Sequence, residues 1–295
     1  MRGARSSRGL VPGREADEKR EVPATTLRLA SQLFMRRATR ALGRTVGLTV
    51  LLSAPPLTRA MSFAQPHRSV TRAEIRAVDE HAIANGLPGV VLMENAALGL
   101  TDVVCEELAA RGAAKGAVVG IVAKTGNNGG DGFVLARQLL LRGFVPRVAY
   151  CGNRAAAKRE TDAGINLSVI EKMAGITIAD ISDGAALAST LAEWSDAALL
   201  VDCLYGTGLD KPLRPDGVAL VEALDAAPTP KIACDLPSGL DCDTGVPLGA
   251  AVKAARTCTF VARKKGFDVA GSEAYTGPVT VVPIGCAEES WAHVV

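Results

Sequence analysis

The chain has 295 residues, of which 48% are hydrophobic and 22% are charged, a composition typical of a globular protein with a sizeable core. Its longest apolar run, residues 46–54, is interrupted by Thr49 and Ser53 and is far shorter than the roughly 18 residues of a membrane helix. This excludes a multi-span membrane protein. Residues 61–295 carry more Asp and Glu than Lys and Arg, and the chain has few aromatic residues, which excludes a nucleic-acid-binding protein.

The first sixty residues differ from the rest, with 12 Lys and Arg against 4 Asp and Glu and repeated Gly and Pro. They show no helical or strand period, which predicts a disordered leader over residues 1–60 before a single domain at 61–295. Three interpretations remain open. A cleaved targeting peptide would place the protein in a mitochondrion or plastid, whereas a signal around Arg36 and Arg37 would direct secretion. An over-extended reading frame with its true start at Met61 predicts a cytoplasmic protein.

Seven cysteines are scattered through the apolar segments, and no two of them form a CxxC pair. An odd number without a regular framework is typical of buried thiols in a reducing compartment.

The ordered pattern begins shortly after Met61. Thr71 and Glu74 have the spacing of a capping box, and Ile75, Val78 and Ala82 then share one face of a predicted helix. A second helix is expected to follow Pro88 and to cover residues 90–112.

Apolar strands then alternate with amphipathic helices. Strands are predicted at 118–123, 145–151, 176–179, 198–204, 231–236, 257–262 and 279–283, and helices after 132 and at 163–174, 185–194 and 218–226. Such alternation predicts an α/β protein: a three-layer α/β/α Rossmann-like domain with a mostly parallel central sheet. Ligands of such folds bind at the carboxyl ends of the strands.

The first of three chemically distinctive loops is expected between the strand at 118–123 and a helix that starts after Gly132. It contains four glycines between Gly126 and Gly132, which lets backbone N–H groups and a helix N-terminus approach a phosphate. The segment lacks GxGxxG, and no acidic residue ends the next strand to hold a ribose, which argues against a dehydrogenase. The sequence therefore predicts a nucleotide-binding loop of another kind.

The other two loops follow the strands at 198–204 and 231–236. The former strand contains Asp202, a carboxylate that needs a cation or hydrogen-bond donors in an apolar strand, and the loop 206–213 follows it. The latter ends in Asp235, Pro237 and Ser238, with Asp235 expected to point into the cleft and Asp241 and Asp243 to form the turn. Across the three loops, three side chains offer oxygen ligands suited to a hard cation: Asn128 of the first loop, Asp202 and Ser238.

Taken together, the segments GNNGGDG, VDCLYGTGLDKP and CDLPSGLDCDTG, with LMENAA upstream and FVARKKGF downstream, resemble the NAD(P)H-hydrate epimerase family, also called the YjeF N-terminal domain family. The resemblance covers residues 71–285 in order. It implies a homodimeric isomerase that converts R-NADHX and R-NADPHX, the hydrated and damaged nicotinamide nucleotides, to the S epimers. A dehydratase on a separate chain would then repair them.

The resemblance also implies the roles of individual residues. It assigns substrate contacts to Asn127, Asn128, Gly129, Gly130, Asp131, Gly206, Thr207, Gly208, Leu209, Asp210, Lys211, Pro212 and Asp235. It assigns a potassium ion to Asn128, Asp202 and Ser238, the same three residues that suggest a hard cation.

Our mechanistic hypothesis makes Asp235 the acid/base, with Asp202 holding the geometry and Lys211 as an electrostatic helper. The alternative is a non-catalytic nucleotide-binding or scaffold module of the same fold. Lys124, at the end of a predicted strand, is either a further phosphate partner or a solvated lysine.

Overall fold

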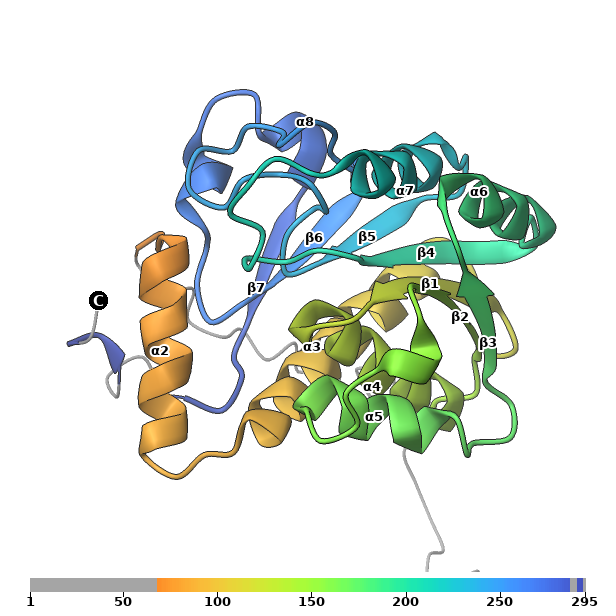
Figure 1. Cartoon of the computed structure of the whole chain (residues 1–295), viewed down its shortest axis with the longest axis horizontal. Coiled ribbons are helices and arrows are strands. Elements are labelled where there is room, and N and C mark those ends of the chain that lie inside the picture. Colours follow the sequence, from red (N-terminus) through yellow and green to blue (C-terminus); the bar gives the residue numbers. More distant parts are fainter. Residues whose placement is uncertain (1–67, 287–290, 294–295) are drawn as a thin grey trace, which may run out of the picture. The chain divides into compact units, whose positions relative to one another are not determined.

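The computed structural model describes residues 68–286 and 291–293, and the predicted leader lies outside them (Figure 1). Its centre is a seven-stranded sheet in the order β3-β2-β1-β4-β5-β6-β7, with every neighbouring pair parallel. The predicted α/β/α fold is confirmed. The strands are β1 (Val118–Lys124), β2 (Val145–Cys151), β3 (Thr177–Ile181), β4 (Ala197–Cys203), β5 (Lys231–Cys234), β6 (Arg256–Phe260) and β7 (Val279–Val282).

Helices cover both faces of this sheet (Figure 1). The α-helices are α2 (Arg72–Ala84), α3 (Gly89–Ala110), α4 (Asn127–Leu141), α5 (Asp162–Ile170), α6 (Gly184–Glu193), α7 (Pro215–Ala226) and α8 (Glu273–Thr276), with 3-10 turns η1 (Arg154–Ala156) and η2 (Lys265–Asp268). The predicted capping box forms: Glu74 N donates to the Thr71 hydroxyl, and Thr71 N donates to the Glu74 carboxylate.

Two apolar cores lie on the two faces of the sheet. In β4, Leu199 and Val201 pack into the core under α2 to α5, and Leu200 between them packs into the core under α6 and α7. Successive strand side chains point to opposite faces, so a strand buried on both faces reads as a continuous apolar run.

The connections leave the sheet in opposite directions between β1 and β4. After β1 the chain enters α4 on one face, whereas after β4 it enters α7 on the other (Figure 1). This reversal is the topological switch point of a doubly wound sheet, and it opens a crevice at the carboxyl ends of β1 and β4.

One prediction was wrong in detail. The segment expected to be a glycine loop is the first turn of α4, which begins at Asn127, and only Gly126, at φ 115°, is a turn residue. The helix packs too closely for side chains: a Cβ on Gly129 would lie 1.6 Å from the Lys124 carbonyl oxygen, and one on Gly130 would lie 2.6 Å from Met93. These glycines are therefore required by packing rather than by loop flexibility.

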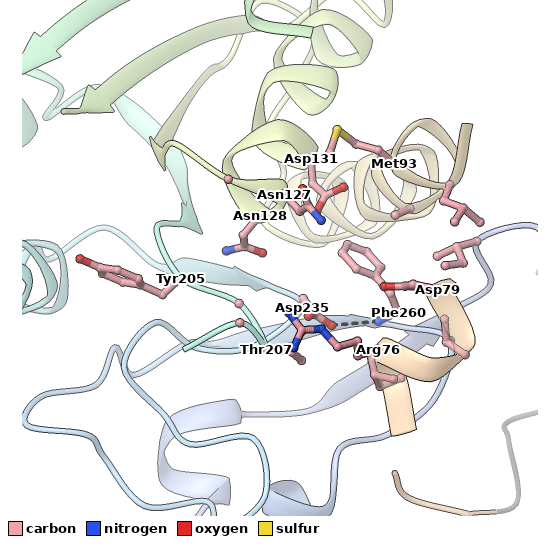
Figure 2. Close-up of a pocket in the computed structure, with 18 of the residues that line it drawn as sticks. Arg76, Asp79, Met93, Asn127, Asn128, Asp131, Tyr205, Thr207, Asp235 and Phe260 are labelled. Atoms are coloured by element: carbon pink, nitrogen blue, oxygen red, sulfur yellow. Dashed lines mark hydrogen bonds between the residues drawn. The ribbon is translucent and has the colours of Figure 1, made fainter. Parts of the chain in front are cut away.

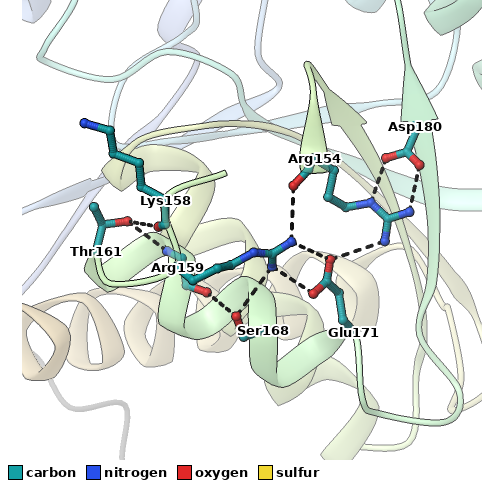
Figure 3. Close-up of polar contacts among 8 residues, drawn as sticks. Arg154, Lys158, Arg159, Thr161, Ser168, Glu171 and Asp180 are labelled. Atoms are coloured by element: carbon teal, nitrogen blue, oxygen red, sulfur yellow. Dashed lines mark hydrogen bonds and ion pairs between the residues drawn. The ribbon is translucent and has the colours of Figure 1, made fainter. Parts of the chain in front are cut away.

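An ion-pair network fixes the chain between β2 and α5 (Figure 3). Arg154 donates two hydrogen bonds to Asp180 of β3, each 2.7 Å long, and Arg159 donates to Glu171 at 2.8 and 3.1 Å. This segment leads into α5, whose Asp162 reaches the wall of the cavity described below. Among the described helices, none is long and apolar enough to cross a membrane.

Candidate active site

A cavity of about 620 Å³ opens at the switch point, within the range of small-molecule sites. Figure 2 shows Asn127, Asn128 and Asp131 on α4 on one side, with Asp235 and Phe260 on the other. Segments after β1, β4, β5 and β6 line it, together with α2 and α3. The sequence prediction of a site at this edge of the sheet therefore agrees with the cavity's position.

Asp235 follows β5 in an unusual backbone conformation. Its φ is 64°, the left-handed region that non-glycine residues rarely adopt, and Leu236 N donates to Cys234 O at 2.7 Å across it. A positive φ with this i to i+2 hydrogen bond describes a classic γ-turn, which is rare and strained. The turn stops β5 at Cys234 and directs the Asp235 carboxylate into the cavity.

One oxygen of that carboxylate is held by one ion pair and two hydrogen bonds. Asp235 Oδ1 pairs with Lys264 Nζ at 2.9 Å and accepts hydrogen bonds from Thr259 Oγ1 at 3.1 Å and from Phe260 N at 3.4 Å. Among residues 68–286 and 291–293, no hydrogen bond is made to Oδ2. The second oxygen is therefore the one available to a molecule in the cavity.

The carboxyl groups of Asp79 and Asp131 also line the cavity, and the pKa of each is raised. Burial, together with the nearby Asp235, raises the pKa of Asp79 to about 6. Burial first, and then the nearby Asp235 and Asp79, raises the pKa of Asp131 well above its usual value. The cavity thus presents a carboxyl group paired to a lysine and, on α4, a buried carboxyl group whose charged form is disfavoured.

The three predicted cation ligands lie around the loop after β4. Asp202 is fully buried; its Oδ2 accepts from Ser238 N at 2.7 Å and its Oδ1 from Ser238 Oγ at 2.5 Å. Burial raises the pKa of Asp202 to about 6, although the Ser238 hydrogen bonds oppose this. Asn128 of α4 packs against Gly206 of the loop after β4, since a Cβ on Gly206 would lie 3.1 Å from Asn128 Oδ1.

Neither amide atom of Asn128 has a hydrogen-bond partner in the described chain, although both are buried. An orphaned buried amide against Gly206, in the loop whose Tyr205 N donates to Ser238 Oγ, fits an oxygen-liganded cation. Within the described residues no three His, Cys, Asp or Glu side chains gather as metal ligands. The amide, hydroxyl and carboxyl oxygens of Asn128, Ser238 and Asp202 would suit a hard cation.

Arg72 of α2 fixes the loop after β4. Its guanidinium donates to the carbonyl oxygens of Thr207 at 2.8 Å and Leu209 at 2.9 Å, and pairs with Asp241 at 2.6 Å. Asp241 also accepts from Asp243 N and from both the N and the hydroxyl of Thr244, so it forms the expected turn. This clamp sets the cavity wall that Thr207 and Leu209 form.

Most of the predicted contact residues reach the cavity: Asn127, Asn128, Asp131, Gly206, Thr207, Gly208, Leu209, Asp210 and Asp235. Gly129 and Gly130 are buried in α4, and Lys211 and Pro212 are exposed and do not line the cavity. Lys124 donates to the Tyr205 hydroxyl at 2.8 Å and lies 4.9 Å from its ring centroid. Its ammonium is thus partnered by a side chain rather than directed at the cavity.

Sequence reasoning missed five charged residues that line the cavity: Arg72, Arg76, Asp79, Asp162 and Lys264. Arg72 lies inside the capping-box segment and Asp79 on a helix, where charged residues usually face solvent. Lys264 precedes Lys265 in the sequence; the first is fully buried and the second exposed, a difference that no local pattern indicates.

Comparisons with known proteins agree with this architecture. Residues 89–266 match the family model described as YjeF-related protein N-terminus. The chain is 35% identical over 215 residues to the NAD(P)H-hydrate epimerase of Limosilactobacillus fermentum, covering 72% of this chain and 95% of that protein. It is 38% identical over 217 residues to the NAD(P)H-hydrate epimerase of Rhodopirellula baltica, covering 73% and 84%.

A longer relative and a solved structure also match this chain. The bifunctional NAD(P)H-hydrate repair enzyme of Pyrobaculum aerophilum is 36% identical over 222 residues, and the match spans 75% of this chain but 42% of that protein. A yeast protein of solved structure superposes with a TM-score of 0.59 at 24% identity, over 68% of this chain and 83% of the other, which supports the fold. The chain belongs to the YjeF-related protein N-terminus family.

Proposed function

We propose that the chain is an isomerase that epimerises R-NADHX and R-NADPHX to their S forms. The carrying observation is the Asp235 carboxylate, with one oxygen held by an ion pair and two hydrogen bonds and the other free to meet a molecule in a cavity large enough for a small-molecule ligand. Relatives named NAD(P)H-hydrate epimerase, at 35% and 38% identity, support the substrate class.

Epimerisation exchanges the configuration of a ring carbon that bears a hydroxyl. Loss and return of the hydroxyl, or opening and closure of the ring, would both accomplish this, and each needs a group beside that carbon that accepts and returns a proton. Asp235 is that group in this proposal. We expect the N-terminus of α4, which has no side-chain cap, to face a phosphate of the nucleotide.

We assign a potassium ion to Asn128, Asp202 and Ser238. The orphaned Asn128 amide and its contact with Gly206 support this assignment. A monovalent cation would supply charge compensation to the buried Asp202 and would hold the loop after β4 against α4. The chain's own residues carry the remaining role: Ser238 donates to Asp202 and accepts from Tyr205 N at 2.8 Å, which links the loops after β4 and β5.

The proposal also includes a homodimer and a dehydratase on a separate chain that consumes the S epimer. Size-exclusion chromatography with light scattering measures the first. The name of the Pyrobaculum aerophilum relative, a bifunctional NAD(P)H-hydrate repair enzyme, supports a second repair reaction that acts with this one. Lys211 stays a prediction as electrostatic helper, and replacing it by Met tests that role.

The deciding experiment incubates the full chain with R-NADHX and an S-specific dehydratase, and follows consumption of the R form by chromatography. We expect acceleration well above the spontaneous rate in a matched sample without the protein. If binding of NADHX raises the melting temperature but no acceleration is seen, the non-catalytic nucleotide-binding module replaces the enzyme as the interpretation.

A further inference from the structure

We infer that Lys264 is a positioning residue that sets the charge and the orientation of Asp235 through a pair of γ-turns at the ends of β5 and β6. The inference rests on the proposed function, because it assigns Lys264 a role only if Asp235 exchanges a proton with substrate. It concerns a residue that lies outside the three loops from which the site was predicted.

The two turns have the same form. Besides Asp235, Val261 is the non-glycine residue with a left-handed φ in the described chain, at 67°, and Ala262 N donates to Phe260 O at 2.7 Å across it. A β-branched residue in this region is a strong conformational outlier, so the surrounding structure must hold it there. Strain at two adjacent strand ends, on both sides of one ion pair, points to a shared role.

The turn at Val261 builds the binding site of the lysine ammonium. Lys264 Nζ donates to Phe260 O at 2.8 Å and to Ala262 O at 3.2 Å, the carbonyl oxygens on either side of Val261. The same ammonium forms an ion pair with Asp235 Oδ1 at 2.9 Å. The fully buried lysine is therefore held by two carbonyl oxygens and one carboxylate.

The main chain of Lys264 is also fixed. Val70 forms a parallel bridge with it, donating its N–H to Arg263 O at 2.8 Å and accepting from Lys265 N at 2.9 Å. The segment before α2 thus holds the lysine in place from outside the sheet. The main-chain bridge and the two carbonyl oxygens thus hold the Lys264 ammonium against Asp235.

The charges around Asp235 make this contact decisive. From the helices, Asp79 of α2 and Asp131 of α4 face it, and the buried thiols of Cys234, Cys242 and Cys258 lie nearby. Two cationic side chains of α2, Arg72 and Arg76, also line the cavity, but in the part of the chain that the structure describes Lys264 is the cation that pairs with Asp235. Without Lys264, the Asp235 carboxylate would be buried near two carboxyl groups with no cation in contact.

An ion-paired Asp235 starts the reaction as a base. Oδ2 accepts the proton of the substrate hydroxyl, the bond between that carbon and the ring nitrogen breaks, and the nitrogen takes the electron pair, which is conjugated with the carboxamide. Closure on the other face re-forms the C–N bond and the proton returns to oxygen. No other reactant is consumed.

The test compares the pH dependence of kcat/KM for R-NADHX in the full chain and in Lys264→Met. The matched control is Lys265→Met, because the neighbouring lysine is exposed. We expect Lys264→Met to lose at least about tenfold in kcat/KM at pH 7, with the acid limb displaced upward by about 1 pH unit or more, as for removal of an adjacent opposite charge. The loss should shrink toward pH 9, and Lys265→Met should keep the wild-type profile.

A second pair of variants covers the case in which Lys264→Met does not fold. Thr259→Val removes another donor to the same oxygen, and Thr259→Ser restores the hydroxyl. We expect Thr259→Val to displace the acid limb in the same direction by a smaller amount and Thr259→Ser to return it.

The outcomes separate this inference from the proposed function. An equal loss at every pH in Lys264→Met, or an unchanged profile in Thr259→Val, would overturn the positioning role. An active Asp235→Asn would instead refute Asp235 as acid/base, and an inactive wild-type chain would refute the epimerase.

Discussion

Replacing Gly129 by Ala tests whether the glycines of α4 serve packing. Ala is favoured over Gly by about 1 kcal/mol inside a helix, so propensity alone predicts that the variant is more stable. The structure predicts the opposite, because the new Cβ would lie 1.6 Å from the Lys124 carbonyl oxygen, and a backbone atom cannot move aside as the end of a side chain can.

The magnitude follows from these opposed effects. Relieving the contact requires α4 to shift by more than an ångström from the end of β1, and overpacking in a core costs about 1–3 kcal/mol or more. We expect Gly129→Ala to lower the free energy of unfolding by at least about 2 kcal/mol, measured by urea denaturation followed by circular dichroism. The control is Gly208→Ala, where a Cβ meets no atom within 4 Å. A Gly129→Ala variant as stable as wild type would refute the packing argument.

Three further predictions concern charge and exposure. The raised pKa of Asp79, about 6, means that the folded state binds this proton more tightly than the unfolded chain. Stability should therefore fall as the pH rises from about 4 to about 6, and Asp79→Asn should be more stable than wild type by about 1–3 kcal/mol at pH 7.5 but not at pH 4 in urea titrations. Arg72→Ala should raise KM for NADHX more than it lowers kcat, because the clamp holds the wall formed by Thr207 and Leu209; an unchanged KM in steady-state kinetics would contradict this. In a thiol titration of the native protein, Cys105 and Cys286, which are partly exposed, should react, whereas the five buried thiols should react only after unfolding.

The fold could be predicted from sequence because its signals are local and repeated. Apolar strands alternate with helices along the chain, and a parallel sheet buried on both faces is the arrangement that satisfies them. The carboxyl-edge position follows from the same rule, which is why Asp235 and most of the loop after β4 could be placed beside the cavity.

The remaining features depend on contacts between distant segments. The glycines before Phe133 look like a loop in sequence, because the close approach of α4 to Lys124 appears only in three dimensions. Lys264 and Arg72 look like surface residues for the same reason. The γ-turns at Asp235 and Val261 carry no glycine or asparagine to reveal a left-handed backbone.

The most direct test of the central claim measures interconversion of R-NADHX and S-NADHX by the full chain and by Asp235→Asn, with melting temperatures recorded for both. If Asp235 exchanges the proton, the variant should fold normally and lose at least about 100-fold in rate, the contribution typical of a general acid/base. A folded Asp235→Asn variant that interconverts the epimers at the wild-type rate would contradict the account.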